Sequence, residues 1–256
     1  MEHAMTINIE QDDIVELIPE PIFTKSAIGF KGIDGGNIKA KLWFCAIEHG
    51  GHQDHTNSIS SDTYLYESNG EHWNVPFDKS SPSNKLDERL SVLAAQCLSC
   101  DEQVMQQKLF TECGSAFKMN LYPLNFPSFK SYENEIPPNI TTGFEEKTIY
   151  KAWCMRKRFP FLRRILASGR ASVLVCVGID AWSDFWLAFP PMAGTKPQRI
   201  FAEGVKPMVY EHTWRAPEGK KVVTVYSTPF PMRRGMGRAE IITLGKYIRS
   251  KHNLNE

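Results

Sequence analysis

Four short apolar runs along the chain predict buried β-strands. Each run is rich in Val, Leu, Ile or Phe and ends in polar or turn-forming residues. Apolar positions are continuous rather than alternating, which is typical of strands that helices cover on both faces of a parallel sheet. The four runs cover residues 41–47, 116–121, 172–178 and 221–227.

Amphipathic patterns between and after these runs predict helices. In the first of them, Leu86, Leu90 and Leu93 recur with helical spacing on one face, and charged residues lie on the other. Asp180 follows the glycine that ends the third apolar run, so we expect it to be the N-cap of a helix. The predicted helices cover residues 86–97, 159–166, 180–189 and 238–252.

The alternation of strands and helices predicts an α/β fold. We expect one domain over residues 1–256, a three-layer α/β/α arrangement with a four-stranded, mainly parallel sheet. Polar stretches near residues 49–85 and 125–150 hold many Gly, Ser, Asn and Pro residues and are interpreted as insertions. Sheets of this class bind ligands beyond the carboxyl ends of their strands. The segments that follow the four strands are therefore the first place to look for a site.

Composition adds an expected compartment. The chain of 256 residues is 42% hydrophobic and 23% charged, as in globular proteins. Its acidic N-terminal segment lacks an apolar run, and no stretch approaches the ~18 apolar residues of a membrane span. We therefore expect neither a secretory signal nor a membrane partner. Six cysteines without a signal are typical of reduced thiols, which predicts a cytoplasmic location.

Charge is distributed unevenly although the net charge is only +1. Residues 1–150 carry 11 Lys and Arg against 22 Asp and Glu, whereas residues 151–256 carry 19 against 7. The two halves can neutralise each other across an internal interface. Alternatively, the basic half offers a face for a polyanion, because clustered Lys and Arg are the electrostatic signature of nucleic-acid binding. The densest basic segments are residues 156–158, 163–164 and 233–234.

Unusual segments follow each predicted strand. The first strand runs into Glu48, His49 and two glycines, and the second ends in Asn-Leu-Tyr-Pro from Asn120. The third ends in Gly-Ile-Asp-Ala-Trp, and the fourth in Ser-Thr-Pro-Phe-Pro, followed by Met-Arg-Arg-Gly. Polar side chains and glycines at the ends of adjacent parallel strands are typical of a ligand-binding edge.

These four segments resemble, in order, the motifs of the uracil-DNA glycosylase superfamily. The stretch AIEHG at 46–50 resembles the first motif, G-[IQEM]-[ND]-P-[GY], with Glu48 at the position of the residue that activates water. Asn120 is at the position of the asparagine that hydrogen-bonds the flipped base, and VLVCVG resembles the strand that leads to a Gly-x-x-Ala turn. The stretch TPFPMRRG resembles the last motif and its wedge loop. The resemblance extends over roughly residues 41–252 and includes the terminal helix.

The chain also departs from the family pattern. His49 replaces the proline of the first motif, Ala46 its first glycine, and Thr228 the histidine that stabilises charge on the departing base. These replacements argue against ordinary uracil excision. The departures therefore suggest a nonstandard base or a modified nucleotide as the target.

The resemblance implies roles for individual residues. Breaking an N-glycosidic bond passes through a cationic, oxocarbenium-like sugar and a departing anionic base, so a carboxylate and hydrogen-bond donors are needed. Glu48 would position the water, with His49 and Thr228 beside it at the catalytic centre. Expected base contacts are Ile47, Asn120 and Tyr122. Expected DNA contacts are Phe230 as a stacking residue, Met232 as the wedge, and Arg233, Arg234 and Arg238 as phosphate clamps.

Two functions from different classes follow. The first is a nucleic-acid base-excising N-glycosylase, and the second is a non-catalytic nucleic-acid-binding or regulatory protein that keeps the glycosylase fold. Glu48 favours the enzyme and Thr228 the binder. Both residues also have a purely structural alternative. Glu48 can be a helix cap or an ion-pair partner, and Asn120 can brace a neighbouring loop.

Metal and cofactor sites are not expected. The segment HGGHQDH at 49–55 offers ligands for metal-dependent hydrolysis, but its spacing matches no closed structural zinc pattern. Cys97 and Cys100 follow the first motif, whereas the iron–sulfur clusters of this superfamily use a ligand pair before it. We expect neither a metal nor another cofactor.

Overall fold

The computed structural model describes residues 35–47, 85–111, 113–122, 146–178, 181–200, 208–219, 221–231 and 235–254. The described strands form one sheet in the order β1-β3-β2-β4-β7-β6-β5. The strands are β1 (Gly35–Gly36), β2 (Leu42–Ala46), β3 (Ala116–Asn120), β4 (Val173–Val177), β5 (Gln198–Ile200), β6 (Val209–Arg215) and β7 (Val222–Thr228).

The four predicted strands are confirmed as β2, β3, β4 and β7, and they are parallel neighbours at the centre of the sheet. The predicted number of strands is wrong, because antiparallel strands extend the sheet on both sides: β1 beside β3, and β6 and β5 beyond β7. β6 was not predicted, because its sequence, VYEHTWR, places polar and apolar residues on both faces of the sheet. It forms an antiparallel pair with β7, the next strand in the chain.

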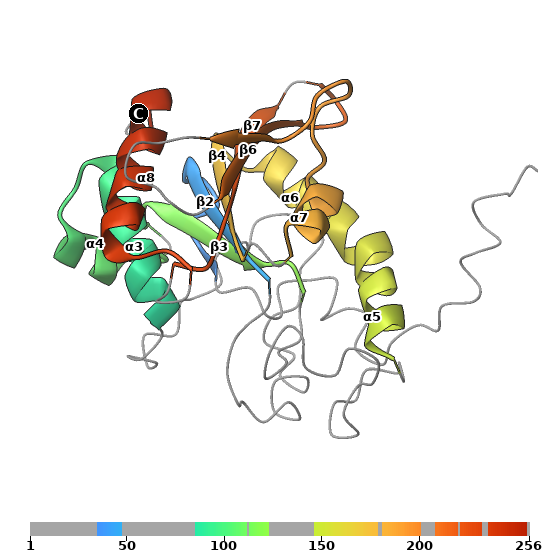
Figure 1. The fold of residues 1–256 in the computed structure, drawn as a ribbon, viewed down its shortest axis with the longest axis horizontal. Helices are drawn as coiled ribbons and strands as arrows, with labels where there is room; N and C mark the ends of the chain where they lie inside the picture. The colour runs from blue at the N-terminus through green and yellow to red at the C-terminus, as the bar shows by residue number, and fades with distance from the viewer. Residues whose placement is uncertain are drawn as a thin grey trace, which may run out of the picture.

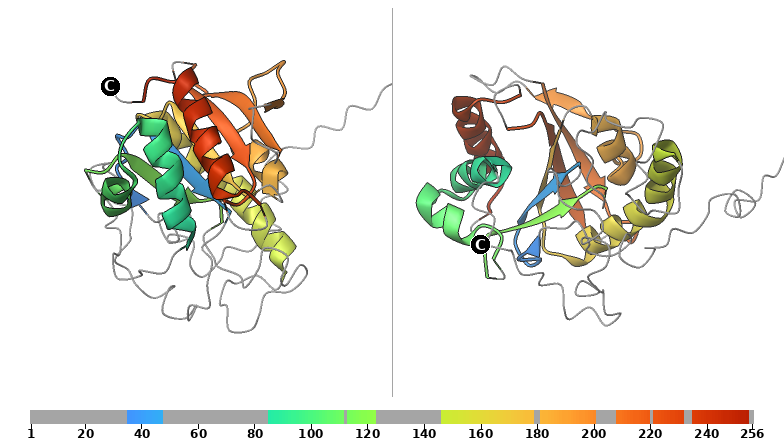
Figure 2. Two further views of the ribbon diagram at one scale, coloured as in Figure 1. Left: turned by 60° about the vertical axis from the view of Figure 1, so that its left-hand side comes forward. Right: turned by 90° about the horizontal axis from the view of Figure 1, so that it is seen from below.

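Helices cover both faces of the sheet (Figures 1 and 2). One face carries α3 (Lys85–Leu98), α4 (Glu102–Lys108) and α8 (Arg238–Lys251). The other carries α5 (Lys147–Trp153), a π-helical turn η2 (Cys154–Arg158), α6 (Phe159–Ser168) and α7 (Trp182–Ala188). Alternate residues of each central strand join opposite cores, so Trp43 and Cys45 pack toward α6 while Leu42 and Phe44 pack toward α3 and α8. The predicted three-layer α/β/α arrangement is confirmed.

The four predicted helices correspond to α3, α6, α7 and α8. The N-cap position of α7 is Ala181, which makes no side-chain capping bond, so the prediction of Asp180 as the cap is wrong. Helices α4 and α5 were not predicted. Helix α5 begins at Lys147, within the last residues of the second predicted insertion. The rest of that insertion and most of the first lie outside the described residues. No described helix is long and apolar enough to cross a membrane.

A lysine enters the apolar layer between β3 and α3. Lys118 is only 1% exposed, and its ammonium group donates to Asp87 Oδ1 over 2.6 Å. The same ammonium group lies 5.6 Å from the centre of the Phe110 ring. Asp87 is in the first turn of α3, where a carboxylate also interacts favourably with the helix dipole. The pair therefore fixes the start of α3 against the middle of β3.

We expect removal of Asp87 to destabilise the protein strongly, because the buried Lys118 ammonium group would lose its ion pair with that carboxylate. Asp87→Ala should lower the free energy of unfolding by about 3–5 kcal/mol, and Asp87→Ala/Lys118→Met should recover most of that loss. Urea unfolding measures both. Glu88→Ala, which truncates an exposed neighbour in the same turn, should change stability by less than about 0.5 kcal/mol. Equal losses in the single and double variants would contradict this account.

Candidate functional site at the carboxyl edge of the sheet

The carboxyl ends of the four central strands lie level with one another. The register pairs Ala46 with both Asn120 and Val177, and Val177 with Thr228. Segments separated by up to 182 positions in the chain thus form one row across the sheet. The chain passes from β3, on one side of β2, to β4 on the other side. This reversal makes the carboxyl ends of β2 and β4 the topological switch point, where open α/β sheets bind their ligands.

Ile47, Gly178 and Phe230 meet at this switch point. The Gly178 N–H donates to the Thr228 carbonyl over 2.8 Å, and the Tyr122 N–H donates to the Ile47 carbonyl over 2.8 Å. Gly178 has φ +123°, and a Cβ atom there would be closer than 3.0 Å to the side chain of Ile47 and 3.1 Å from the Phe230 ring. Only glycine satisfies both the backbone conformation and the close approach. The strand ends are therefore connected by main-chain bonds and by packing against a bare backbone.

A fully buried arginine supports the end of β3. Arg158 is 0% exposed; its Nε donates to the Leu121 carbonyl over 3.0 Å and its Nη2 to the Asn120 carbonyl over 2.9 Å. Burial lowers the pKa of the Arg158 guanidinium, and the neighbouring Cys154 and Tyr150 groups oppose that shift. The π-helical turn η2, an uncommon geometry that is frequent at functional sites, presents this side chain to the strand end.

One of the two interpretations of the uneven charge placed residues 156–158 on a basic face, and this is wrong for Arg158, which is buried. A usable signal was present, because Tyr150, Cys154, Arg158 and Leu162 recur every four residues and all four are buried. The next predicted basic pair is also partly structural. Arg163 Nη1 donates to the carbonyls of Leu187 and Ala188 at the end of α7, while Arg164 is exposed.

Tyr122 and Thr228 lie at the expected edge but are buried. The Tyr122 ring packs against Tyr150 and Phe159, and its hydroxyl donates to Asp184 Oδ2 of α7 over 2.9 Å. The Thr228 hydroxyl lies 3.3 Å from the Cys176 carbonyl and 3.1 Å from the Pro229 carbonyl. Since a carbonyl only accepts, the hydroxyl proton of Thr228 is directed to the main chain.

Asn120, Ile47 and Phe230 are also brought to this edge, whereas Arg238 has another partner. Asn120 and Ile47 are each 1% exposed, and Phe230 is partly exposed. Arg238, at the start of α8, forms an ion pair with Glu102 of α4, although 54% of its side-chain surface stays exposed. Its predicted role as a phosphate clamp would require this pair to open.

Five predicted site residues lie outside the described residues: Glu48, His49, Met232, Arg233 and Arg234. Their roles stay predictions. The HGGHQDH segment is likewise outside. Among the described residues no group of three or more His, Cys, Asp or Glu side chains is arranged to hold a metal ion. Burial raises the pKa of the Cys154 thiol to about 12, so this cysteine is a neutral core residue near neutral pH.

Comparison with known proteins gives no assignment for this site, since no protein-family model and no curated protein matches the chain.

We expect Arg158→Lys to destabilise the end of β3, because an ammonium group cannot reproduce two directed bonds from a planar guanidinium. The free energy of unfolding should fall by about 2–4 kcal/mol. Hydrogen exchange of the Leu121 and Tyr122 amides, which bond to the carbonyls of Ala46 and Ile47, should accelerate more than exchange in β6. Arg164→Lys, on the exposed side of α6, is the matched control and should leave both readouts unchanged. Identical effects of the two variants would refute the positioning role.

Gly178→Ala separates close packing from backbone strain when it is compared with Gly219→Ala. Both glycines have positive φ, +123° and +73°, but a Cβ atom on Gly219 would meet nothing within 4 Å. We expect Gly219→Ala to cost about 1 kcal/mol from backbone strain alone. Gly178→Ala should cost about 1–3 kcal/mol more, because Ile47 and Phe230 must move. Thermal or urea unfolding measures the loss of stability in each variant. Equal losses would show that Ile47 and Phe230 can move away from a Cβ atom without an additional loss.

Proposed function

We propose that this chain hydrolyses the N-glycosidic bond of a flipped, uracil-like or modified base in nucleic acid. The observation that carries the proposal is the row formed by Ala46, Asn120, Val177 and Thr228. The four segments that resemble glycosylase motifs begin in or directly after this row. The proposal includes a uracil-DNA glycosylase-like fold, in which the four parallel strands form the central part of the wider sheet.

The chemistry needs a carboxylate close to the sugar and donors close to the base. Glu48 follows Ile47 directly in the chain, and the Ile47 carbonyl is bound to the end of β3. Glu48 would position the attacking water from there. Asn120 ends the neighbouring strand, with its carbonyl bound by Arg158, and an amide side chain offers both a donor and an acceptor for reading a base.

A base inside a duplex is out of reach, so the target must be extruded at a cost of a few kcal/mol. Phe230, partly exposed and packed next to Gly178, would stack on the extruded nucleotide. Met232 would act as the wedge, and Arg233, Arg234 and Arg238 would contact phosphates. His49 would assist charge stabilisation on the departing base. We also propose a cytoplasmic location, because the six cysteines of the chain are interpreted as reduced thiols.

One observation favours the second function, a non-catalytic binder or regulator of nucleic acid. Thr228 is at the position where the family carries a charge-stabilising histidine, and its hydroxyl proton is directed to main-chain carbonyls. A buried hydroxyl in that arrangement offers nothing to a departing anion. The catalytic reading therefore depends on Glu48, His49 and Asn120.

Glu48→Gln tests the catalytic reading because it keeps the side-chain shape and removes the charge. Oligonucleotides with uracil, other damaged bases or modified cytosines, single- and double-stranded, are incubated with each protein, and abasic sites are scored by alkaline cleavage. We expect wild type to excise one class of base and Glu48→Gln to be slower by about 100-fold or more. Glu218→Gln changes an exposed carboxylate in the turn between β6 and β7, at the opposite edge, and should retain wild-type rates.

Absence of cleavage by wild type, with binding to the same oligonucleotides that falls steeply as salt rises, would replace the enzyme with the binder. Cleavage that survives in Glu48→Gln would remove Glu48 from the mechanism. Binding that does not respond to salt would contradict both functions.

A further inference from the structure

Three aromatic rings cluster on the side of α7 that does not enter the core. The centre of the Trp182 ring lies 5.1 Å from that of Trp186 and 4.8 Å from that of Tyr210, and Trp186 and Tyr210 are 5.7 Å apart. All three residues are partly exposed. At the rim, the Tyr210 hydroxyl donates to the Met208 sulfur over 3.7 Å, and Met208 is 42% exposed. We call Trp182, Trp186 and Tyr210 the aromatic platform.

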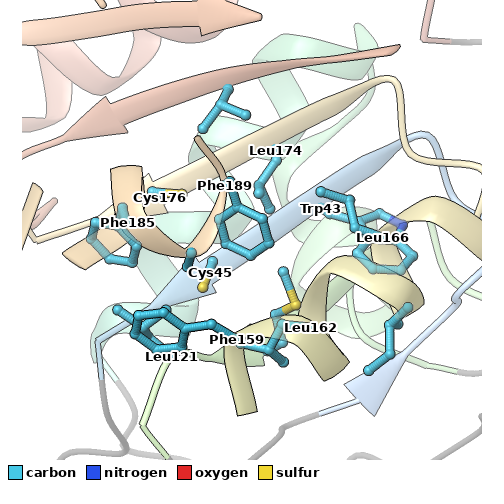
Figure 3. Packing of buried hydrophobic residues seen from close by; sticks show 14 of the residues in the cluster. Trp43, Cys45, Leu121, Phe159, Leu162, Leu166, Leu174, Cys176, Phe185 and Phe189 are labelled. Carbon is cyan, nitrogen blue, oxygen red and sulfur yellow. The ribbon is translucent and has the colours of Figure 1, made fainter. Parts of the chain in front are cut away.

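The platform is not required to fill the core beneath α7. Phe185 and Phe189 perform that role and are almost completely buried among the side chains between α6, α7 and the sheet (Figure 3). Trp182 and Trp186 are one helical turn apart and bring a second aromatic surface to the helix. Tryptophan and tyrosine left open to solvent in contact with each other are typical of binding surfaces.

The platform adjoins the candidate site. Tyr210 is paired with Ser227, the residue before Thr228, so it lies one position from the row at the carboxyl edge. Trp182 follows Gly178 by four residues. Asp184, on the same helix, accepts the hydrogen bond from Tyr122 and so fixes α7 to the end of β3. A chain bound at the edge can therefore continue onto the platform.

The charges around the platform favour a polyanion. Arg199 of β5 is exposed and is the cross-strand partner of Tyr210, so the two side chains project from the same face of the sheet. Lys196, just before this edge strand, is exposed as well. Of the nearby acids among the described residues, Glu211 accepts a hydrogen bond from Tyr247 of α8 on the opposite face, and Asp184 accepts one from Tyr122. Aromatic rings beside cationic side chains are the usual combination for single-stranded nucleic acid.

We infer that the aromatic platform stacks unpaired bases next to the target nucleotide of a single-stranded nucleic acid, while Arg199 and Lys196 contact its phosphates. The inference rests on the proposed function, because it names the form in which nucleic acid reaches the carboxyl edge. It also extends that function, since Trp182, Trp186, Tyr210 and Arg199 were given no role by the motif resemblance.

Stacking is separable from phosphate attraction by comparing two probes on the unaltered protein. One is a thymidine oligomer of about 12 nucleotides, and the other is an abasic backbone of the same length and charge. We expect the thymidine oligomer to bind about 10-fold or more tightly and to quench tryptophan fluorescence, whereas the abasic backbone should bind weakly without quenching. Trp43, Trp153 and Trp214 are buried, so they should contribute little to the quenching. Equal binding of the two probes would overturn the inference.

Substitutions then locate the contact. Trp182→Ala and Tyr210→Ala should each weaken binding of the thymidine oligomer about 5- to 100-fold and leave binding of the abasic backbone unchanged. Trp182→Phe, which keeps a ring, should retain most of the affinity and keeps the test valid if the alanine variant does not fold. Leu187→Ala removes an exposed apolar side chain from the same helix and should have no effect. Losses in Leu187→Ala equal to those in Trp182→Ala would overturn the inference.

Arg199→Gln tests the phosphate contact of the platform. The control is Arg215→Gln, which changes an exposed arginine at the end of β6 remote from Tyr210. Arg199→Gln should weaken binding of both probes and flatten the salt dependence by about one unit of slope, and Arg215→Gln should not. Base excision by wild type with equal binding of the two probes would refute the platform and leave the glycosylase standing. Base-dependent binding without any excision would refute the glycosylase and leave the platform.

Discussion

Burial of both faces of the central parallel strands is the constraint on which the rest of this structure depends. Helices cover β2 and β4 on each side, so almost every side chain of these strands is removed from water. In such an environment a polar group must have a fixed partner. The partner of Lys118 is Asp87, and the partners of Arg158 are two main-chain carbonyls at the end of β3. These polar contacts connect the helical layers to defined positions in the sheet.

The same constraint makes the carboxyl edge suitable for recognition. The strand ends are connected through the Gly178 and Tyr122 amides and through the packing of Ile47 and Phe230 against Gly178. Side chains that extend beyond the edge thus start from a rigid main chain. Rigid support of this kind is what a site needs when it stabilises charge that develops during a reaction. Thr228 does not extend beyond the edge in this way, because its hydroxyl bonds to the main-chain carbonyls of Cys176 and Pro229.

Helix α7 connects the candidate site to the aromatic platform. Its inner residues complete the core, Asp184 bonds to Tyr122 at the end of β3, and its outer tryptophans contact Tyr210 of β6. A base-excising enzyme and a binder would use this arrangement differently. The enzyme needs neighbouring nucleotides to be held while one base is extruded, whereas the binder needs only the stacking. Either proposed function would use the same location, because the outer tryptophans of α7 lie beside the carboxyl edge.

The sequence by itself determined the parallel centre of the fold and its principal helices. Continuous apolar runs identify β2, β3, β4 and β7, because a strand buried on both faces needs apolar residues at every position. Helical spacing of apolar residues identifies α3, α6, α7 and α8 for the equivalent reason. Both signals are local, since each depends on residues a few positions apart. The predicted strands also gave the positions of the strand ends, and these identified the candidate edge.

Only the tertiary structure decided what depends on distant pairing. β6 lacks a clear one-sided pattern and becomes a strand through its bonds with β7, which also carry Tyr210 to Trp182, 28 positions earlier in the chain. Arg158 looked like part of a surface patch, and a π-helical turn brings it into the core beneath β3. The number of strands, the burial of Arg158 and the aromatic platform all arise from contacts between segments that are remote in sequence. No local pattern encodes such contacts, because their free energy exists only once the layers have packed.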